Sequence, residues 1–139
     1  MLVEPDVYEL LLTPWQQTLL RKRKTVASRS MLIAEFYIEM EFWRQRCEFV
    51  RPPREGADLT IRTNTGLVSF EVKGTADDKV AIEKLKVSSC KSFDLVSSGI
   101  TVLRIMRALT TRPLVAELKY RRHFLLKREA RWRATKGAE

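Results

Sequence analysis

Residues 56–75 read GADLTIRTNTGLVSFEVKGT, and this stretch decides the fold. Residues 57–63 alternate apolar and polar side chains as a half-buried strand does, and residues 67–73 continue as a second strand. Asn64-Thr65-Gly66 between the two runs is typical of a tight turn, and Gly74 ends the second run. The stretch therefore predicts a β-hairpin.

Charged side chains are expected to meet at one end of this hairpin. Successive side chains point to opposite faces of a strand, so Glu71 and Lys73 share a face. Asp58 lies at the start of the first strand and Glu71 near the end of the second, and antiparallel pairing brings such positions together. Two carboxylates can hold Mg²⁺, while a neighbouring ammonium can orient or deprotonate a water. The pattern indicates phosphodiester hydrolysis.

The segments on either side predict an α/β protein. The expected elements, in chain order, are a helix at 4–23 kinked or broken at Pro14, a helix at 28–46 capped by Ser28 or Ser30, a short strand at 47–50, the hairpin at 57–73, a helix at 78–92, a buried strand at 100–106 and a basic helix at 113–135. Together they predict a single domain, residues 1–139, with a mixed central sheet of about four strands flanked by helices.

The hairpin also carries a family resemblance. GADL at 56–59, followed by VSFEVKGT at 68–75, resembles the motif of the PD-(D/E)xK nuclease superfamily, which includes restriction endonucleases and Holliday-junction resolvases. The run SMLIAEFYIEMEFWRQRCEFVRPP at 30–53 is similar to the helix and exit strand that precede this motif. The resemblance covers about residues 28–107 and implies a restriction-endonuclease-like core. One departure is Ala57, which stands where the motif name has proline, at a position that varies in the superfamily.

The resemblance also implies roles for individual residues. Asp58 and Glu71 would bind Mg²⁺ or Mn²⁺, and Lys73 would be the catalytic lysine. Glu35 matches an acid that the preceding helix often supplies, and it would be a further catalytic and metal-binding residue. Glu39 lies one turn away on the same helix and could substitute for Glu35.

The tripeptide Glu71-Val72-Lys73 alone does not establish a nuclease site, for two reasons. Glu117-Leu118-Lys119 and Asp77-Asp78-Lys79 also fit the (D/E)xK pattern, but neither is expected to lie in an apolar strand that follows a hairpin aspartate. A structural alternative also exists for the hairpin residues. In that alternative Asp58 caps a strand, while Glu71 and Lys73 form an ion pair on a solvated face.

The charge of the chain favours a polyanionic partner. Lysine and arginine number 26 against 17 acids, which gives a net charge of +9. A basic protein of this size often binds nucleic acid, through side chains that contact phosphates. The candidate contacts lie in two clusters: Arg21, Lys22, Arg23, Lys24, and Lys119, Arg121, Arg122, Lys127, Arg128.

The cysteines and histidine exclude several other kinds of site. Cys47 and Cys90 are far apart, and His123 is the only histidine, so zinc sites and Ser-His-Asp hydrolase centres are not expected. No disulfide framework is expected either, and a reducing, cytoplasmic location follows. The chain has no apolar run of the ~18 residues that a membrane helix needs, and its start lacks the basic region of a signal peptide.

These features predict a metal-dependent DNA endonuclease without an organic cofactor. Since one site cuts one strand, a chain of this size that makes paired cuts is expected to act as a homodimer. Its substrate could be a junction or repair structure, or the enzyme could belong to a mobile element or phage. The alternatives are a non-catalytic nucleic-acid-binding protein that keeps the nuclease fold, and a structural subunit whose basic tail docks an acidic protein.

Overall fold

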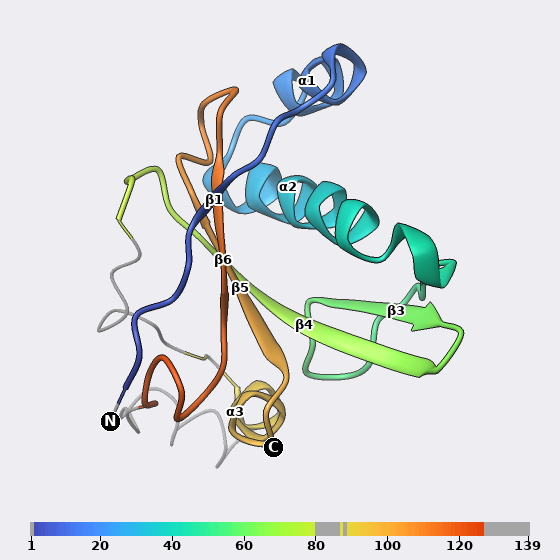
Figure 1. Ribbon diagram of the computed structural model, residues 1–139, viewed down its shortest axis with the longest axis vertical. Helices are drawn as coiled ribbons and strands as arrows, with labels where there is room; N and C mark the ends of the chain where they lie inside the picture. Colours follow the sequence, from blue (N-terminus) through green and yellow to red (C-terminus); the bar gives the residue numbers. More distant parts are fainter. Residues whose placement is uncertain (1, 80–86, 88, 127–139) are drawn as a thin grey trace.

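The computed structural model describes residues 2–79, 87 and 89–126 and shows a mixed sheet with helices packed against it (Figure 1). The sheet has six strands in the order β1-β6-β5-β4-β3-β2. The elements are β1 Tyr8–Glu9, α1 Pro14–Arg21, α2 Val26–Glu41, the 3₁₀ turn η1 Trp43–Gln45, β2 Glu48–Phe49, β3 Leu59–Thr63, β4 Gly66–Gly74, α3 Cys90–Ser97, β5 Thr101–Met106 and β6 Leu114–Leu118. The protein therefore belongs to the α/β class.

The predicted hairpin is confirmed. Strand β3 pairs antiparallel with β4, and the register runs from Leu59 opposite Phe70 to Thr63 opposite Gly66. Gly66 has φ +133°, a backbone conformation that favours glycine, at the turn between them. The short strand at 47–50 and the buried strand at 100–106 are confirmed as β2 and β5. Strand β5 runs parallel to β4, and all of its residues are buried.

Helix α2 is confirmed, but its cap differs from the prediction. The helix begins at Val26, earlier than expected, and ends at Glu41, before the expected end at residue 46, because the chain continues as the 3₁₀ turn η1. Thr25 is the N-cap residue, and its hydroxyl accepts a hydrogen bond from the Ser28 N–H at 3.0 Å. A threonine hydroxyl can cap a helix N-terminus as a serine hydroxyl does. Because Thr25 has this role, Ser28 and Ser30 lie inside the helix.

The predicted helix over 4–23 is wrong in its first half. Residues Tyr8 and Glu9 form β1, which pairs antiparallel with β6, and only Pro14–Arg21 is helical. Proline has no N–H to donate, which harms a helix interior but is harmless in the first turn. Thr13 and Gln16 form a reciprocal capping box around this start. Pro14 therefore starts a helix where the prediction had it interrupt one.

The predicted basic helix over 113–135 is also wrong where the structure describes it. Residues Leu114–Leu118 form β6, which pairs antiparallel with β5. Pairing with a fully buried neighbour strand outweighs the helical propensity of this segment. Residues 127–135 of the prediction lie outside the described residues. Strands β1 and β6 raise the strand count from the expected four or so to six.

The predicted helix over 78–92 falls largely outside the described residues. Where the chain is described, Asp78 and Lys79 are not helical, and helix α3 begins only at Cys90. Ser89 caps it by accepting a hydrogen bond from the Ser92 N–H at 3.1 Å. The last residues of the predicted helix are therefore the first residues of a later one.

The two faces of the sheet carry separate apolar clusters. On one face α2 packs against β3, β4 and β5, through residues that include Ile33, Phe70 and Leu103. On the other face Val96 of α3 packs near Val102 and Phe124. Glu71 and Lys73 lie on this second side because they alternate with Phe70 along β4. No helix in the described part of the chain has the length and apolar character needed to cross a bilayer.

A buried arginine holds the turn between α1 and α2 against the sheet. Arg29 is only 8 % exposed, and its guanidinium donates to backbone carbonyls of Leu20, Ala108 and Thr110 at 3.0, 2.6 and 3.1 Å. Burial lowers the pKa of Arg29. These bonds fix the start of α2, and the basic turn before it, beside the loop that follows β5.

Candidate active site

Asp58 is held in place by backbone contacts on both sides. Its N–H donates to the carbonyl of Phe70 at 3.0 Å, and its Oδ2 accepts from the N–H of Val72 at 2.7 Å. The loop before it is tied to α3, because Ser92 Oγ donates to the carbonyl of Gly56 at 2.8 Å. Gly56 has φ +92°, and a Cβ there would meet the backbone of Lys91 at 3.0 Å. The glycine of the GADL run thus permits the close approach that positions Asp58.

Glu71 lies opposite Asp58 on the neighbouring strand. Its side chain is 4 % exposed and shares a small gap with Val96, Val102 and Phe124, so it does not lie on a solvated face. Burial, together with the hydrogen bond and negative charge of Asp58, raises the pKa of Glu71 to about 8, although Lys73 opposes the shift. Glu71 therefore keeps its proton near neutral pH.

Lys73 completes the predicted group, and a fourth charged side chain lies beside it. Lys73 is partly buried at the end of β4, and its partner in the parallel register is Arg104 of β5. Arg104 is 9 % exposed, and burial lowers its pKa, whereas the charge of Asp77 raises it. Sequence reasoning missed Arg104. The available signal was a single arginine inside the apolar run of residues 100–106.

A cavity of about 410 Å³ opens at this end of β4. The pairing of β3 with β4 stops at Leu59 and Phe70, whereas β4 continues to Gly74, so the strand edge beyond Asp58 is not covered by β3. The lining residues come from the start of α2 and from this edge: Val26, Ala27, Ser30, Met31, Asp58, Val72, Lys73 and Gly74. Asp58 and Lys73 are therefore both among the residues that line this cavity.

Glu35 does not join the carboxylate pair. Its Oε1 forms an ion pair with Arg51 Nη2 at 2.9 Å, and the pKa of neighbouring Glu39 is raised by burial and by the charge of Glu35. Within residues 2–79, 87 and 89–126, no three acidic, histidine or cysteine side chains lie close enough together to hold a metal ion. The structure therefore unites Asp58, Glu71 and Lys73 and leaves Glu35 and Glu39 apart from them.

The basic residues fall in two places. Arg21, Lys22, Arg23 and Lys24 are exposed and form the turn that leads into α2, whose first residues line the cavity. Lys119, Arg121 and Arg122 are exposed just after β6, while Lys127 and Arg128 lie outside the described residues. The first cluster therefore directly precedes the part of α2 that lines the cavity.

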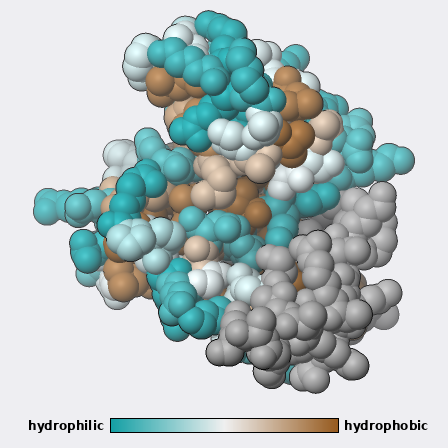
Figure 2. Space-filling view, turned by 180° about the vertical axis from the view of Figure 1, so that it is seen from behind, coloured by the Kyte–Doolittle hydropathy of each residue, from teal (hydrophilic) through white to brown (hydrophobic). Residues whose placement is uncertain are grey.

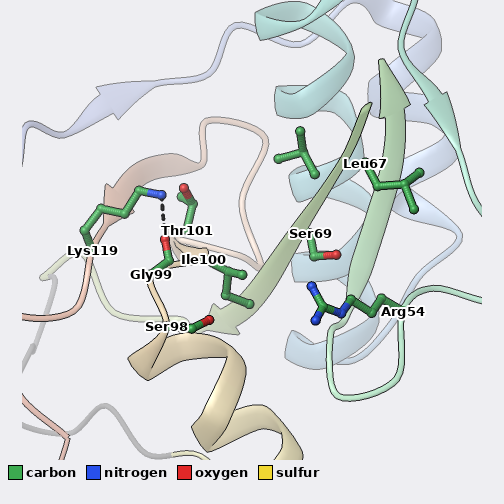
Figure 3. Close-up of a pocket in the computed structure, with 9 residues that line it drawn as sticks. Arg54, Leu67, Ser69, Ser98, Gly99, Ile100, Thr101 and Lys119 are labelled. Atoms are coloured by element: carbon green, nitrogen blue, oxygen red, sulfur yellow. Dashed lines mark hydrogen bonds between the residues drawn. The ribbon is translucent and has the colours of Figure 1, made fainter. Parts of the chain in front are cut away.

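A second hollow, of about 440 Å³, lies on the same side of the sheet as Glu71 but nearer the start of β4. Figure 3 shows Arg54 and Lys119 on opposite walls, with Ser69, Ser98 and Thr101 between them. Lys119 Nζ donates to the carbonyl of Gly99 at 2.8 Å. Figure 2 views the molecule from behind and shows a mostly hydrophilic surface with apolar residues visible between the hydrophilic ones.

The look-alike tripeptides do not reproduce the site. Glu117 and Leu118 do lie on a strand, β6, contrary to prediction, and Lys119 follows it, but the Glu117 carboxylate accepts a hydrogen bond from Tyr37 at 2.5 Å on the α2 side. Lys119 instead reaches Gly99. Asp77-Asp78-Lys79 is exposed beyond the end of β4. Among the described residues, the pairing of two carboxyl groups with a lysine on one sheet face occurs at Asp58, Glu71 and Lys73.

No protein-family model, curated protein or solved structure matches the chain. The arrangement itself defines the available chemistry. A buried carboxyl with a pKa near 8 beside a second carboxyl is a strong cation ligand pair once the proton leaves. The neighbouring lysine supplies a positive charge and a proton-transfer group at the wall of an open cavity.

Proposed function

We propose that the protein is a divalent-metal-dependent deoxyribonuclease whose active site consists of Asp58, Glu71 and Lys73. The observation that carries the proposal is the pairing of Asp58 with buried Glu71, next to Lys73 and beside an open cavity. A buried carboxyl pair costs free energy when both groups are ionised, and such costs are concentrated at functional sites.

The donor set suits Mg²⁺ or Mn²⁺. Both cations accept carboxylate oxygens, and Mg²⁺ commonly binds through one or two carboxylates while its remaining ligands are waters and substrate phosphates. Asp58 and Glu71 supply those two carboxylates, so the separate position of Glu35 does not prevent binding. A cation bound by the two carboxyl groups would displace the proton that Glu71 keeps near neutral pH.

The residues of the proposed site have distinct tasks in the reaction. A bound divalent ion would polarise the phosphate and make a nearby water easier to deprotonate. The Val72 N–H fixes one oxygen of Asp58, which keeps the carboxylate oriented without a change of conformation. Lys73 orients the water or accepts its proton, and it offsets negative charge that grows on the phosphate.

A restriction-endonuclease-like core is part of the proposal. The element order α2, β2, β3, β4, α3, β5 supports it, because the family resemblance of residues 28–107 implies that order. The placement of Asp58 just before β3 and of Glu71 on β4 supports it further. Strands β1 and β6 would then be additions at one edge of the sheet.

DNA is the proposed substrate because the chain carries a net charge of +9 and has the basic residues Arg21–Lys24 just before the helix start that lines the cavity. Paired cuts would need two copies of a one-site chain, so we include a homodimer in the proposal. Sedimentation should show a dimer, alone or on DNA. A monomer under both conditions would remove this part of the proposal and leave single-strand cleavage intact.

The affinity for Mg²⁺ or Mn²⁺ should rise with pH up to about 8 and then level off. Glu71 must lose its proton to bind the cation, so affinity should increase by up to about tenfold per pH unit below its pKa of about 8. Calorimetry in two buffers of different ionisation enthalpy should detect about one proton released near pH 7. An affinity that does not change with pH would contradict the raised pKa of Glu71.

Parallel cleavage assays test the function and identify the substrate. The protein should be incubated with Mg²⁺ and with duplex, nicked, flapped, single-stranded and four-way junction DNA. Cutting of at least one of them, abolished by a chelator, supports the proposal. Salt-sensitive binding without any cutting would instead identify a nucleic-acid-binding protein that lacks nuclease activity.

A further inference from the structure

The first turn of α2 faces the cavity beside the proposed active site. Val26 and Ala27 are the first two residues of the helix and line the cavity. Their N–H groups have no acceptor within the helix, since the first intrahelical bond runs from Arg29 N to Thr25 O and the Ser28 N–H is taken by Thr25 Oγ1. The start of a helix of this length carries partial positive charge and favours anions.

A second observation in the same cavity is an unpartnered hydroxyl. Ser30 is 2 % exposed and lines the cavity, and its Oγ finds no hydrogen-bond partner among the described residues. A serine inside a helix usually bonds to a preceding carbonyl of its own helix. A buried hydroxyl left without a partner costs free energy unless a ligand or water satisfies it. Gly74 opposite leaves space for it, because a Cβ there would lie 1.7 Å from Ser30 Oγ.

The charges around the cavity favour a phosphate over a cation at this end. Lys73 lies on the wall, and the exposed basic turn Arg21–Lys24 leads directly into the helix start. Asp58 is the acid among the described lining residues, and it lies at the side where the proposed metal ion would neutralise it. A phosphate here would contact the helix N–H groups, and the positive charge of Lys73 at the wall would favour its binding.

We propose that this cavity holds one backbone phosphate of the DNA strand, bound by the N–H groups of Val26 and Ala27 and by the hydroxyl of Ser30, with Lys73 among the residues of its wall. This inference rests on the proposed nuclease function and adds the contact that positions the strand beside the carboxylate pair. It assigns to α2 a part in substrate binding that does not involve Glu35.

Ala27→Glu separates a binding role of the helix start from a structural one. An acid in the first turn should maintain or raise the melting temperature, because it complements the helix dipole. The same acid would repel a phosphate, so the affinity for a short labelled DNA duplex, measured without divalent ions, should fall about tenfold or more. Met40→Glu is the control, since it makes the same charge change at the exposed last turn of the same helix. Equal affinity losses for the two variants would overturn the inference.

Two further measurements do not depend on cleavage. On addition of inorganic phosphate, the amide resonances of Val26 and Ala27 should shift most; shifts confined to Arg21–Lys24 would overturn the proposal.

Ser30→Ala should weaken binding of the duplex several-fold while the melting temperature stays the same or rises. If Ala27→Glu binds DNA as the parent does while cleavage still requires Asp58, the phosphate site at the start of α2 is refuted and the nuclease function stands. If the parent protein cuts no DNA, the proposed nuclease function is wrong. Resonance shifts of Val26 and Ala27 on addition of phosphate would still support the phosphate site.

Discussion

Replacing Lys73 by alanine should lower the rate of DNA cleavage by roughly a hundredfold to ten-thousandfold, the range associated with loss of a proton-transfer group. Lys73 shares a sheet face with Glu71 and lines the cavity that Asp58 also lines. The affinity for DNA should fall less than about tenfold, because one ammonium is lost from a surface with many basic residues. Single-turnover cleavage at saturating protein and a separate binding titration measure the two effects.

Lys79→Ala is the matched control for this experiment. Lys79 ends the look-alike tripeptide Asp77-Asp78-Lys79 and is exposed beyond β4. Its replacement removes the same charge and should leave the cleavage rate within about twofold of the parent's, as for other exposed side chains away from the reacting groups. Equal rates for the parent and Lys73→Ala would show that Lys73 is not the catalytic lysine.

Glu71→Gln should abolish cleavage and yet make the protein more stable at alkaline pH. The folded state raises the pKa of Glu71 from 4.5 to about 8, so it binds this proton more tightly than the unfolded chain does. The stability gained from that proton is complete below about pH 4.5 and is lost as the pH rises to about 8. Glutamine is neutral at every pH, so Glu71→Gln does not lose stability as the pH rises. At 1.36 kcal/mol per unit, the shift corresponds to at most roughly 5 kcal/mol in the free energy of unfolding.

Denaturant unfolding at about pH 5 and about pH 9 measures this effect without a metal ion. The parent and Glu71→Gln should be similar at the lower pH, whereas the variant should be more stable at the higher pH by a few kcal/mol. Glu55→Gln is a suitable control, because Glu55 is an exposed acid in the loop before Asp58. A Glu71→Gln protein that is less stable than the parent at both pH values would contradict a buried carboxyl that keeps its proton at neutral pH.

The hairpin could be predicted from the sequence because its signals are local. Alternation fixes which residues share a face, and the turn fixes the register, so the meeting of Asp58 with Glu71 follows from residues 56–75 alone. The motif glycine also has a local cause, since Gly56 adopts a positive φ close to α3. This part of the fold needs little information from the rest of the chain.

The edge strands could not be predicted, because their stability depends on distant partners. Tyr8–Glu9 is a strand only through its pairing with Leu114 and Val115, and β6 in turn depends on β5. Both segments contain apolar residues at spacings that also suit a helix. Long-range pairing of this kind outweighs the local preference of a short segment.

The surroundings of the site were likewise hidden in the sequence. Glu35 has the chain position that the resemblance implies, but its ion pair with Arg51 and its place on α2 separate it from the pair. Arg104 and Ser30 come next to the site through the packing of β5 and α2 against β4. Such proximity depends on tertiary packing, which spacing along the chain does not specify.

The most direct test of the central claim compares the parent protein with Asp58→Asn in a Mg²⁺-dependent DNA cleavage assay. Asp94→Asn is the control, because Asp94 is an exposed acid on α3 and its replacement makes the same charge change. We expect the parent and Asp94→Asn to cut the DNA, and Asp58→Asn to bind it without cutting. Cleavage by Asp58→Asn at the parent's rate would contradict the assignment of the active site to Asp58, Glu71 and Lys73.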